Sequence, residues 1–304
     1  MKTMQLPKFD SVDEIQLNLM ESLLHDGKMV NARLMKTLEI HPSGFILKHP
    51  RARYIKNQAR KWSLPLAIGE FAWHLSASND VNFIGYYAKQ WKAFSEDEKT
   101  ISDSCYGHKI FKSNDKGKSQ WNNIVSLLKE DPDTRRAVLS LYDTSNEFGP
   151  FSKDVSCICT IHFLIRDGRL DAITHMRSND IILGLPYDIF LVTMLQEYLA
   201  TILSVELGDY YHFANSMHLY ERHFDLAQDI LNSSNFEVVE MAPMKDLDNI
   251  PLFLNIEAAI RLGENPVNFE DKLGSYWGYL MSVLQEYQTK KHKVDESHII
   301  SASA

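Results

Sequence analysis

The chain has 304 residues, of which 44% are hydrophobic, and a formal net charge of −8 at pH 7. This size and composition predict one domain over residues 1–304 with a large core, and the negative charge excludes broad contact with a nucleic-acid backbone. No signal-peptide core or run of about 18 apolar residues occurs and the three cysteines are an odd number, so we expect a cytoplasmic protein without membrane contact or a disulfide framework.

Both helix and strand patterns occur along the chain. In the first half we expect a helix over 12–27 with Ser11 as cap, a strand pair over 37–48 joined by a turn at 42–44, a buried helix over 65–75, a loop at Tyr106-Gly107 and a helix over 119–130. In the second half we expect a strand over 137–142, then a hairpin of strands 157–166 and 169–176, and then a long buried helix after Pro186. A strand over 210–220 and a helix from His223 should follow. Two weaker strands and a polar tail of about 290–304 complete the chain.

The stretch from Met176 to Asp188, MRSNDIILGLPYD, concentrates polar side chains between a predicted strand and the long buried helix. It holds Arg177, acidic residues and a turn interrupted by Gly184 and Pro186. Ligand-binding groups often lie where a strand leads into a helix, because both neighbours hold the loop rigid. From this pattern alone, a binding site and a simple strand-to-helix turn are equally good interpretations.

Two other charged sites also allow two interpretations. Glu70 lies in a helix that is apolar on nearly every side, so it either serves a function in the interior or faces water at a helix end. Arg135 and Arg136 precede a strand and point to opposite faces, so one chain cannot easily direct both to the same small ligand. The alternative is that they form a solvated surface pair.

The order of the motifs is more specific than any one of them. A thiol on a strand, a DG hairpin, RSND…LGLPYD, a buried helix, LGDYYH and HLY follow one another between about Arg33 and the helix after His223. This order resembles the thymidylate synthase superfamily. The resemblance implies an α+β fold, in which helices pack a mixed sheet around a long buried central helix. It also implies a homodimer that forms through the sheet and shares its active sites.

The resemblance assigns catalytic roles to three of these residues. Cys157, twenty positions before Arg177, matches the nucleophilic cysteine, whereas Cys159 comes two residues too late. Without that context, a free cysteine is most often a small buried hydrophobe. Glu70 matches the glutamate that orders water and shuttles protons, and Tyr106 matches the tyrosine near the pyrimidine C5 proton.

A second set of residues is implied to bind a pyrimidine nucleoside monophosphate: Arg33, Arg135, Arg136, Arg177, Ser178, Asp188, His218 and Tyr220. Arg177 would bind phosphate and, by its charge, favour the thiolate of Cys157. Arg33 matches a phosphate-binding arginine on a mobile loop, although Leu34-Met35-Lys36 replace the glycine-rich residues that normally follow it.

The arginine pair Arg135-Arg136 matches one that reaches the phosphate site of the neighbouring subunit, which removes the difficulty of their opposite directions. His218 and Tyr220 alternate on one strand face and match the pair that holds the sugar 3′-hydroxyl. As zinc ligands, His212, His218 and His223 lack a supporting cysteine or an HxxxH spacing, so no metal is expected.

The resemblance also implies a co-substrate, 5,10-methylenetetrahydrofolate. Asp180 matches the aspartate that meets its pterin, and Gly184 is expected to contribute to the same site. After Cys157 adds to C6 of the base and C5 takes up the one-carbon unit, either water or hydride can quench the exocyclic methylene. The tail HIISASA, Ile158 and Asn215-Ser216 differ from the corresponding residues of synthases and favour water.

Asp188 stands where thymidylate synthases have asparagine. Cytosine presents an exocyclic amino donor and an N3 acceptor, the reverse of uracil, and a carboxyl group suits that pattern. Deoxycytidylate hydroxymethylases of the superfamily carry aspartate here, so the resemblance implies 5-hydroxymethylation of dCMP. The structural alternative is that Asp188 caps a helix after Tyr187.

Three other functions remain open. A CMP hydroxymethylase of a nucleoside antimetabolite pathway is one, because no residue that we can interpret fixes the sugar 2′ position. A thymidylate synthase acting on dUMP is the second. The third is a catalytically silent protein that binds nucleotides or RNA, against which the intact Cys157, Glu70 and Arg177 argue.

Overall fold

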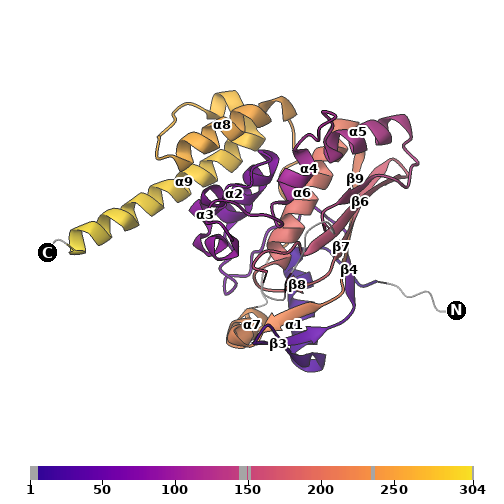
Figure 1. Cartoon of the computed structure of the whole chain (residues 1–304), viewed down its shortest axis with the longest axis vertical. Helices are drawn as coiled ribbons and strands as arrows, with labels where there is room; N and C mark the ends of the chain where they lie inside the picture. Colours follow the sequence, from indigo (N-terminus) through magenta and orange to yellow (C-terminus); the bar gives the residue numbers. More distant parts are fainter. Residues whose placement is uncertain (1–5, 144–148, 150–151, 234–236, 303–304) are drawn as a thin grey trace.

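Two β-sheets form the framework of the protein (Figure 1). The structure is a computed structural model and describes residues 6–143, 149, 152–233 and 237–302. The larger sheet contains, in spatial order, β1 (Lys8–Phe9), β4 (Ser43–Leu47), β9 (Glu206–Ala214), β7 (Arg169–Met176), β6 (Ile158–Arg166) and β5 (Val138–Ser140). The smaller sheet contains β2 (Lys28–Ala32), β3 (Met35–Ile40), β10 (Met217–Tyr220) and β8 (Asn179–Asp180). Both sheets mix parallel and antiparallel pairs, and together with the helices they confirm the predicted α+β fold.

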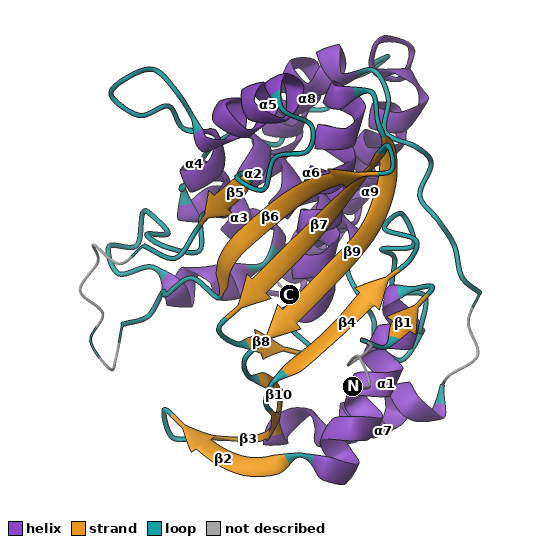
Figure 2. Ribbon diagram, turned by 90° about the vertical axis from the view of Figure 1, so that its right-hand side faces the viewer, coloured by secondary structure: helices purple, strands orange, loops and turns teal. Residues whose placement is uncertain are grey.

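Most of the helices gather on one face of the larger sheet, and Figure 2 shows the opposite face of β6, β7 and β9 without a covering helix in the described chain. The helices are α1 (Val12–Asp26), α2 (Leu64–Leu75), α3 (Val81–Tyr87), η1 (Lys89–Phe94), α4 (Tyr106–Phe111), α5 (Gln120–Glu130), α6 (Leu185–Leu203), η2 (Glu221–His223), α7 (Phe224–Asn232), η3 (Leu247–Asn249), α8 (Ile250–Arg261) and α9 (Glu270–Ala302). Along these three strands, buried residues alternate with partly exposed ones, as expected for a sheet packed on one side. None of the helices in the described residues is long and apolar enough to cross a membrane.

Helix α6 is the buried helix that the sequence predicts after Pro186. It connects β7 to β9, which are parallel neighbours, and a parallel connection requires a crossover across one sheet face. Its residues are apolar all round, and most of them are buried. Gly184 is its N-cap and Pro186 lies in its first turn, so the Gly/Pro turn directs the chain from the smaller sheet into this helix.

Several other predicted elements are confirmed. Helix α1 begins after Ser11, whose Oγ accepts the backbone N–H of Glu14 at 3.3 Å. Helix α5 begins after Ser119 in the same way. The hairpin between β6 and β7 turns at Asp167 and Gly168, both with positive φ (51° and 73°), the turn that an Asp-Gly pair favours.

Two predicted strand arrangements are wrong. The strands expected over 37–48 both form, but β3 pairs with β2 and β10 while β4 pairs with β1 and β9, so they belong to different sheets. The single strand expected over 210–220 is broken at Asn215-Ser216, and its two halves, β9 and β10, also lie in different sheets. Turn residues mark where a strand ends, but they do not select its partner strand.

Two loop and strand predictions are also wrong, and both segments are helical. Tyr106 and Gly107 start α4, which is too short to show a helical period in the sequence. The weaker strands expected after α7 are replaced by α8 and α9, and the polar tail continues α9 as far as Ala302; residues 303–304 lie outside the described part of the chain.

Candidate active site

Five of the expected nucleotide-binding residues line one pocket of about 330 Å³: Arg33, Arg177, Ser178, His218 and Tyr220. The pocket lies between the two sheets, because β7 delivers Arg177 and Ser178 to it while β3 and β10 form its other wall. The sequence therefore predicted a set of residues that the fold brings together from positions far apart in the chain.

His218 and Tyr220 lie on β10, opposite Glu39 and Thr37 of β3. Nδ1 of His218 is 3.4 Å from Oγ of Ser178, and burial lowers the pKa of this imidazole. A neutral ring offers one donor and one acceptor nitrogen, which suits a sugar hydroxyl. This strand face can therefore bind a hydroxylated ligand in the manner expected for the sugar.

Arg33 lies at the tip of the hairpin between β2 and β3. Both Arg33 and Leu34 have positive φ (49° and 64°), a conformation that is unfavourable for non-glycine residues. Leu34 is 92% exposed, so no packing contact explains why a leucine occupies this position. This tight turn brings Arg33 to the pocket without the glycine-rich residues that the resemblance leads us to expect after it.

Cys157 is half-buried at the start of β6, and its Sγ lies 3.6 Å from Nη2 of Arg177. The same guanidinium donates from Nε to the carbonyl of Ser156 and from Nη2 to that of Val155, both at 2.9 Å. Burial raises the pKa of the Cys157 thiol to about 11, and Arg177 offsets only part of this increase. The arginine acts in the expected direction, but the thiol is protonated in the free protein at neutral pH.

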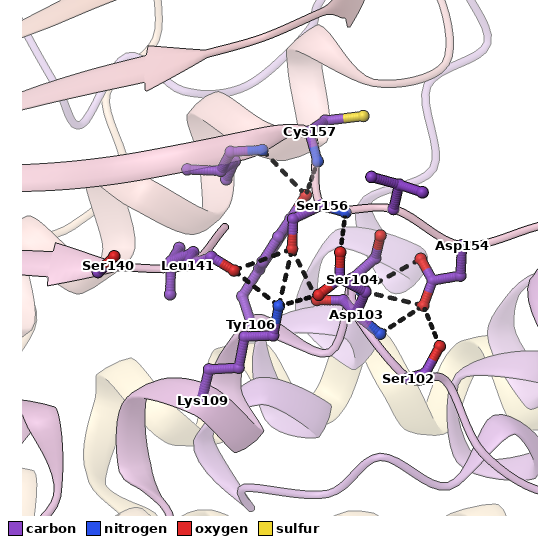
Figure 3. Close-up of polar contacts among 12 residues, drawn as sticks. Ser102, Asp103, Ser104, Tyr106, Lys109, Ser140, Leu141, Asp154, Ser156 and Cys157 are labelled. Atoms are coloured by element: carbon purple, nitrogen blue, oxygen red, sulfur yellow. Dashed lines mark hydrogen bonds and ion pairs between the residues drawn. The ribbon is translucent and has the colours of Figure 1, made fainter. Parts of the chain in front are cut away.

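A network that the sequence did not predict anchors the segment before Cys157 (Figure 3). The ammonium of Lys109 forms an ion pair with Asp103 and donates to Oγ of Ser156 at 2.9 Å and to the carbonyl of Leu141 at 2.6 Å. Asp103 in turn accepts the backbone N–H of Ser156. These groups fix the backbone that carries the thiol, and no sequence signal links Lys109 and Asp103 to it.

Tyr106 lies beneath the same backbone. Its hydroxyl oxygen accepts the N–H groups of Cys157 and Ile158 at 3.2 and 3.3 Å. Burial raises the pKa of the phenol, so it stays neutral and keeps its own O–H for another acceptor.

Asp188 is partly buried in the first turn of α6. Its Oδ2 accepts a hydrogen bond from Nδ2 of Asn179 at 2.7 Å. Burial raises the pKa of Asp188 to about 8, the nearby charge of Glu70 adds to the increase, and the bond from Asn179 opposes it. Because Gly184 caps the helix, the interpretation of Asp188 as a helix cap is wrong. Asn179 lies within the RSND motif, but its neighbours in the sequence gave no sign of this contact.

Asp180 has one satisfied and one free carboxylate oxygen. Oδ1 accepts the N–H groups of Ile182 and Leu183 at 2.7 and 2.9 Å, whereas Oδ2 is buried and has no hydrogen-bond partner. A buried acceptor of this kind fits a ligand N–H group, as the expected pterin contact requires. Gly184 lies close by, since a Cβ there would come within 3.1 Å of both Asn179 and Asp188.

Two expected features lie elsewhere. Arg135 and Arg136 are exposed and do not line the pocket of their own chain. His212 is buried in the larger sheet, stacked on Phe45 at 4.8 Å between ring centroids, and burial lowers its pKa to about 3. Among the described residues, no group of three or more His, Cys, Asp or Glu side chains is placed to hold a metal ion.

Comparison with known proteins agrees with this geometry. A family model described as thymidylate synthase matches residues 17–255, which include every site residue discussed above. The chain belongs to the thymidylate synthase family. It is therefore a one-carbon transferase that acts on a pyrimidine nucleotide.

Within the thymidylate synthase family, the chain is similar to phage enzymes. It is 25% identical over 296 residues to the deoxyuridylate hydroxymethyltransferase of Bacillus phage SP01, covering 93% of this chain and 76% of that protein. It is 32% identical over 190 residues to the protein of the same name from Pseudomonas phage M6, covering 60% of this chain and 48% of that protein. It is 26% identical over 248 residues to the deoxycytidylate 5-hydroxymethyltransferase of Enterobacteria phage T2, covering 76% and 94%.

Proposed function

We propose that the protein is a cytidylate 5-hydroxymethylase that prefers dCMP and uses 5,10-methylenetetrahydrofolate as co-substrate. Asp188 is the observation that carries this proposal. With a pKa raised to about 8, its carboxyl group is protonated at neutral pH and offers one donor and one acceptor. Since Asn179 donates to Oδ2, the proton belongs on Oδ1, and the side chain can serve both the N3 acceptor and the amino donor of cytosine.

The relatives support hydroxymethylation but differ in the base. The Bacillus phage SP01 relative is named for deoxyuridylate and the Enterobacteria phage T2 relative for deoxycytidylate. Both are hydroxymethyltransferases, so they favour capture of the one-carbon unit by water. Between the two bases, the protonated carboxyl of Asp188 favours cytosine.

In the proposed mechanism, Cys157 loses its proton and forms a bond from Sγ to C6 of the base. The C5–C6 π electrons then make C5 nucleophilic, and the proton of Asp188 neutralises the charge that gathers at N3. The guanidinium of Arg177 binds the substrate phosphate and stabilises the thiolate. Tyr106 holds the backbone of Cys157 and keeps its O–H directed to the site near C5.

The folate supplies the one-carbon unit, and Asp180 would hold its pterin through the unpartnered Oδ2. Glu70, whose side chain is 14% exposed, lies close enough to Asp188 to raise its pKa. We assign Glu70 to the water molecule that adds to the exocyclic methylene. Its carboxylate takes the proton of that water as the new C–O bond forms.

We also propose a homodimer in which Arg135 and Arg136 bind the phosphate in the partner's pocket. Both arginines are exposed and lie outside the lining of their own chain's pocket. The uncovered face of the larger sheet carries partly exposed apolar side chains, among them Leu164, Ile173, Tyr211 and Phe213. A partner sheet that covers this face would bury them and bring the arginines to the second site.

The test is to incubate the protein with methylenetetrahydrofolate and dCMP, CMP or dUMP, and to follow C5-proton release and the mass of the product. We expect 5-hydroxymethyl-dCMP as the main product. Preferential turnover of dUMP would contradict the assignment of Asp188. Formation of dihydrofolate would show that hydride, and not water, quenches the exocyclic methylene. The Cys157→Ser variant should bind dCMP but form no product.

The second candidate is CMP hydroxymethylation. Glu39 lines the pocket opposite His218, where its Oε1 accepts the hydroxyl of Ser216 at 2.5 Å. A carboxylate at this place could also accept a bond from a ribose 2′-hydroxyl. A kcat/KM for CMP above that for dCMP in the same assay would favour this candidate.

A further inference from the structure

His74 is a buried imidazole beside Glu70 for which the mechanism above has no role. It lies one turn after Glu70 on α2 and has no exposed surface. Its Nδ1 accepts the backbone N–H of Gly107 at 3.0 Å. A ring nitrogen that accepts a hydrogen bond carries no proton, so the neutral ring has its hydrogen on Nε2.

The Nε2–H group has no hydrogen-bond partner in the described structure. The carboxylate oxygen nearest to it is Oε1 of Glu70, at 3.9 Å. A movement of about 1 Å by the Glu70 side chain would bring the two atoms to the usual N–H···O distance. A buried donor without an acceptor is unfavourable, so the interior favours this movement.

Two further contacts hold the ring in this orientation. It stacks on the ring of Tyr106, with the centroids 5.7 Å apart and the planes 29° apart. The backbone of Gly107 lies so close that a Cβ there would be 2.0 Å from the carbonyl oxygen of His74. His74 is therefore fixed between Glu70 and Tyr106, and it is the Glu70 side chain that can move.

We propose that His74 is a positioning residue that donates Nε2–H to Glu70 and holds its carboxylate directed at the water of the hydration step. The inference rests on the proposed function. In this step the water oxygen bonds to the exocyclic methylene carbon, and its proton passes to Glu70. As the water adds, the methylene π electrons move into the ring and Asp188 protonates N3. N3 then returns this proton to Asp188, the C5–C6 double bond re-forms, and Cys157 leaves as the thiolate.

The experiment compares two substitutions of similar length, His74→Gln and His74→Met. The glutamine amide can replace both hydrogen bonds of the imidazole, whereas methionine can donate none. Each variant is incubated with dCMP, methylenetetrahydrofolate and a fixed concentration of 2-mercaptoethanol. This thiol adds to the exocyclic methylene without help from Glu70 and gives a thioether, so the ratio of hydroxymethyl to thioether product measures how well water is activated.

We expect His74→Met to lower this ratio about tenfold, which is less than the loss of an acid–base group itself because Glu70 is still present, and His74→Gln to keep it near that of the unmodified protein. His108→Met is the control, because His108 is bonded to the carbonyl of Ala77 at 2.8 Å and takes no part in the site. Exchange of the C5 proton of dCMP in D₂O without folate should continue in all three variants, since it needs only Cys157, Asp188 and Tyr106.

An unchanged ratio in His74→Met would overturn the inference while leaving the hydroxymethylase assignment intact. If the unmodified protein formed no hydroxymethyl product, this result would instead contradict the proposed function as a hydroxymethylase. If His74→Met does not fold, ¹⁵N NMR of the unmodified protein decides: an Nε2–H tautomer for His74 agrees with the proposal, and an Nδ1–H tautomer contradicts it.

Discussion

In the proposed function, Asp188 and Asn179 act together to read the base. Their hydrogen bond leaves the proton of the carboxyl group on Oδ1, and a site built for one donor–acceptor order leaves polar groups unpaired when it meets the other. We therefore expect Asp188→Asn to move the preference from dCMP to dUMP by roughly 100-fold or more in the ratio of kcat/KM values. Asp209→Asn, at a carboxylate that pairs with Lys48 outside the site, is the control and should leave the preference unchanged. Retained preference for dCMP in Asp188→Asn would exclude this residue as the base reader.

The same carboxyl group predicts the pH dependence. Its pKa is raised to about 8, so the proton needed at N3 is present below that pH and is lost as the pH rises through it. We expect kcat/KM for dCMP to fall above about pH 8. The thiol of Cys157 cannot cause this fall, because its ionisation increases with pH. The Asp188→Asn variant acting on dUMP should lack this fall, and its persistence there would point to another group.

At this scale the sequence predicts the residues that belong to a motif and misses those that support them. Arg177, Asp180 and Asp188 stand at fixed spacings from one another, so a resemblance can identify them. Asn179 can donate its hydrogen bond to Asp188 only because the turn at Gly184 places the start of α6 next to β8. The support that Lys109 gives to Cys157 depends on a fold that brings a distant helix to the start of β6.

Helix α6 is tied to the rest of the core by a buried ion pair between Glu197 and Arg53. Neither side chain is more than 4% exposed, and Glu197 also accepts the backbone N–H of Met244 at 3.0 Å. We predict that Glu197→Leu lowers the free energy of unfolding by about 3–5 kcal/mol, because it leaves the Arg53 charge buried and unpaired. Denaturant unfolding measures the change. Adding Arg53→Met to this variant should recover a large part of the loss, and a double variant as unstable as the single one would show that the charge is not the cause.

The hairpin between β2 and β3 gives a second prediction for an element. Leu34 has a positive φ of 64° and is exposed, and asparagine tolerates this conformation better than leucine. Leu34→Asn should therefore stabilise the protein by about 0.5–1 kcal/mol in denaturant unfolding. Leu262→Asn, at an exposed leucine with a φ of −82°, is the matched control and should give no gain.

Helices and strands could be predicted where a short stretch of sequence contains the whole signal, such as a hydrophobic period, a cap residue or a turn dipeptide. The Asp167-Gly168 hairpin and the capped helix α1 are examples, and both are confirmed. The sequence could not show that β9 and β10 part at Asn215-Ser216 to join different sheets, because partner strands are chosen by packing between distant segments. The sequence did not predict α8 and α9, because Pro251 in the first turn of α8 and the non-helical Gly274 inside α9 are residues that usually interrupt a helix pattern.

For the whole molecule, the proposed shared site predicts complementation between inactive chains. A chain with Arg135→Ala and Arg136→Ala keeps its own Cys157, and a Cys157→Ser chain keeps its arginines. In a mixed dimer, one of the two sites would contain both intact groups. Equal mixing after dissociation should restore about a quarter of the unmodified activity if subunits pair at random. No recovery, with mixed dimers verified by mass spectrometry, would mean that each site is built from one chain.

The order of the strands in the larger sheet also determines when this protein can fold during its synthesis. Strand β4 pairs with β9, so the stretch between Leu47 and Glu206 must be made before the inner edge of β4 is covered. At about 5–20 residues per second, the ribosome takes roughly 10–30 s over this stretch. Throughout that time the chain that has emerged carries a strand with an open edge and an unfinished core. Nascent chains that end before β9 are therefore the form of this protein most in need of a chaperone.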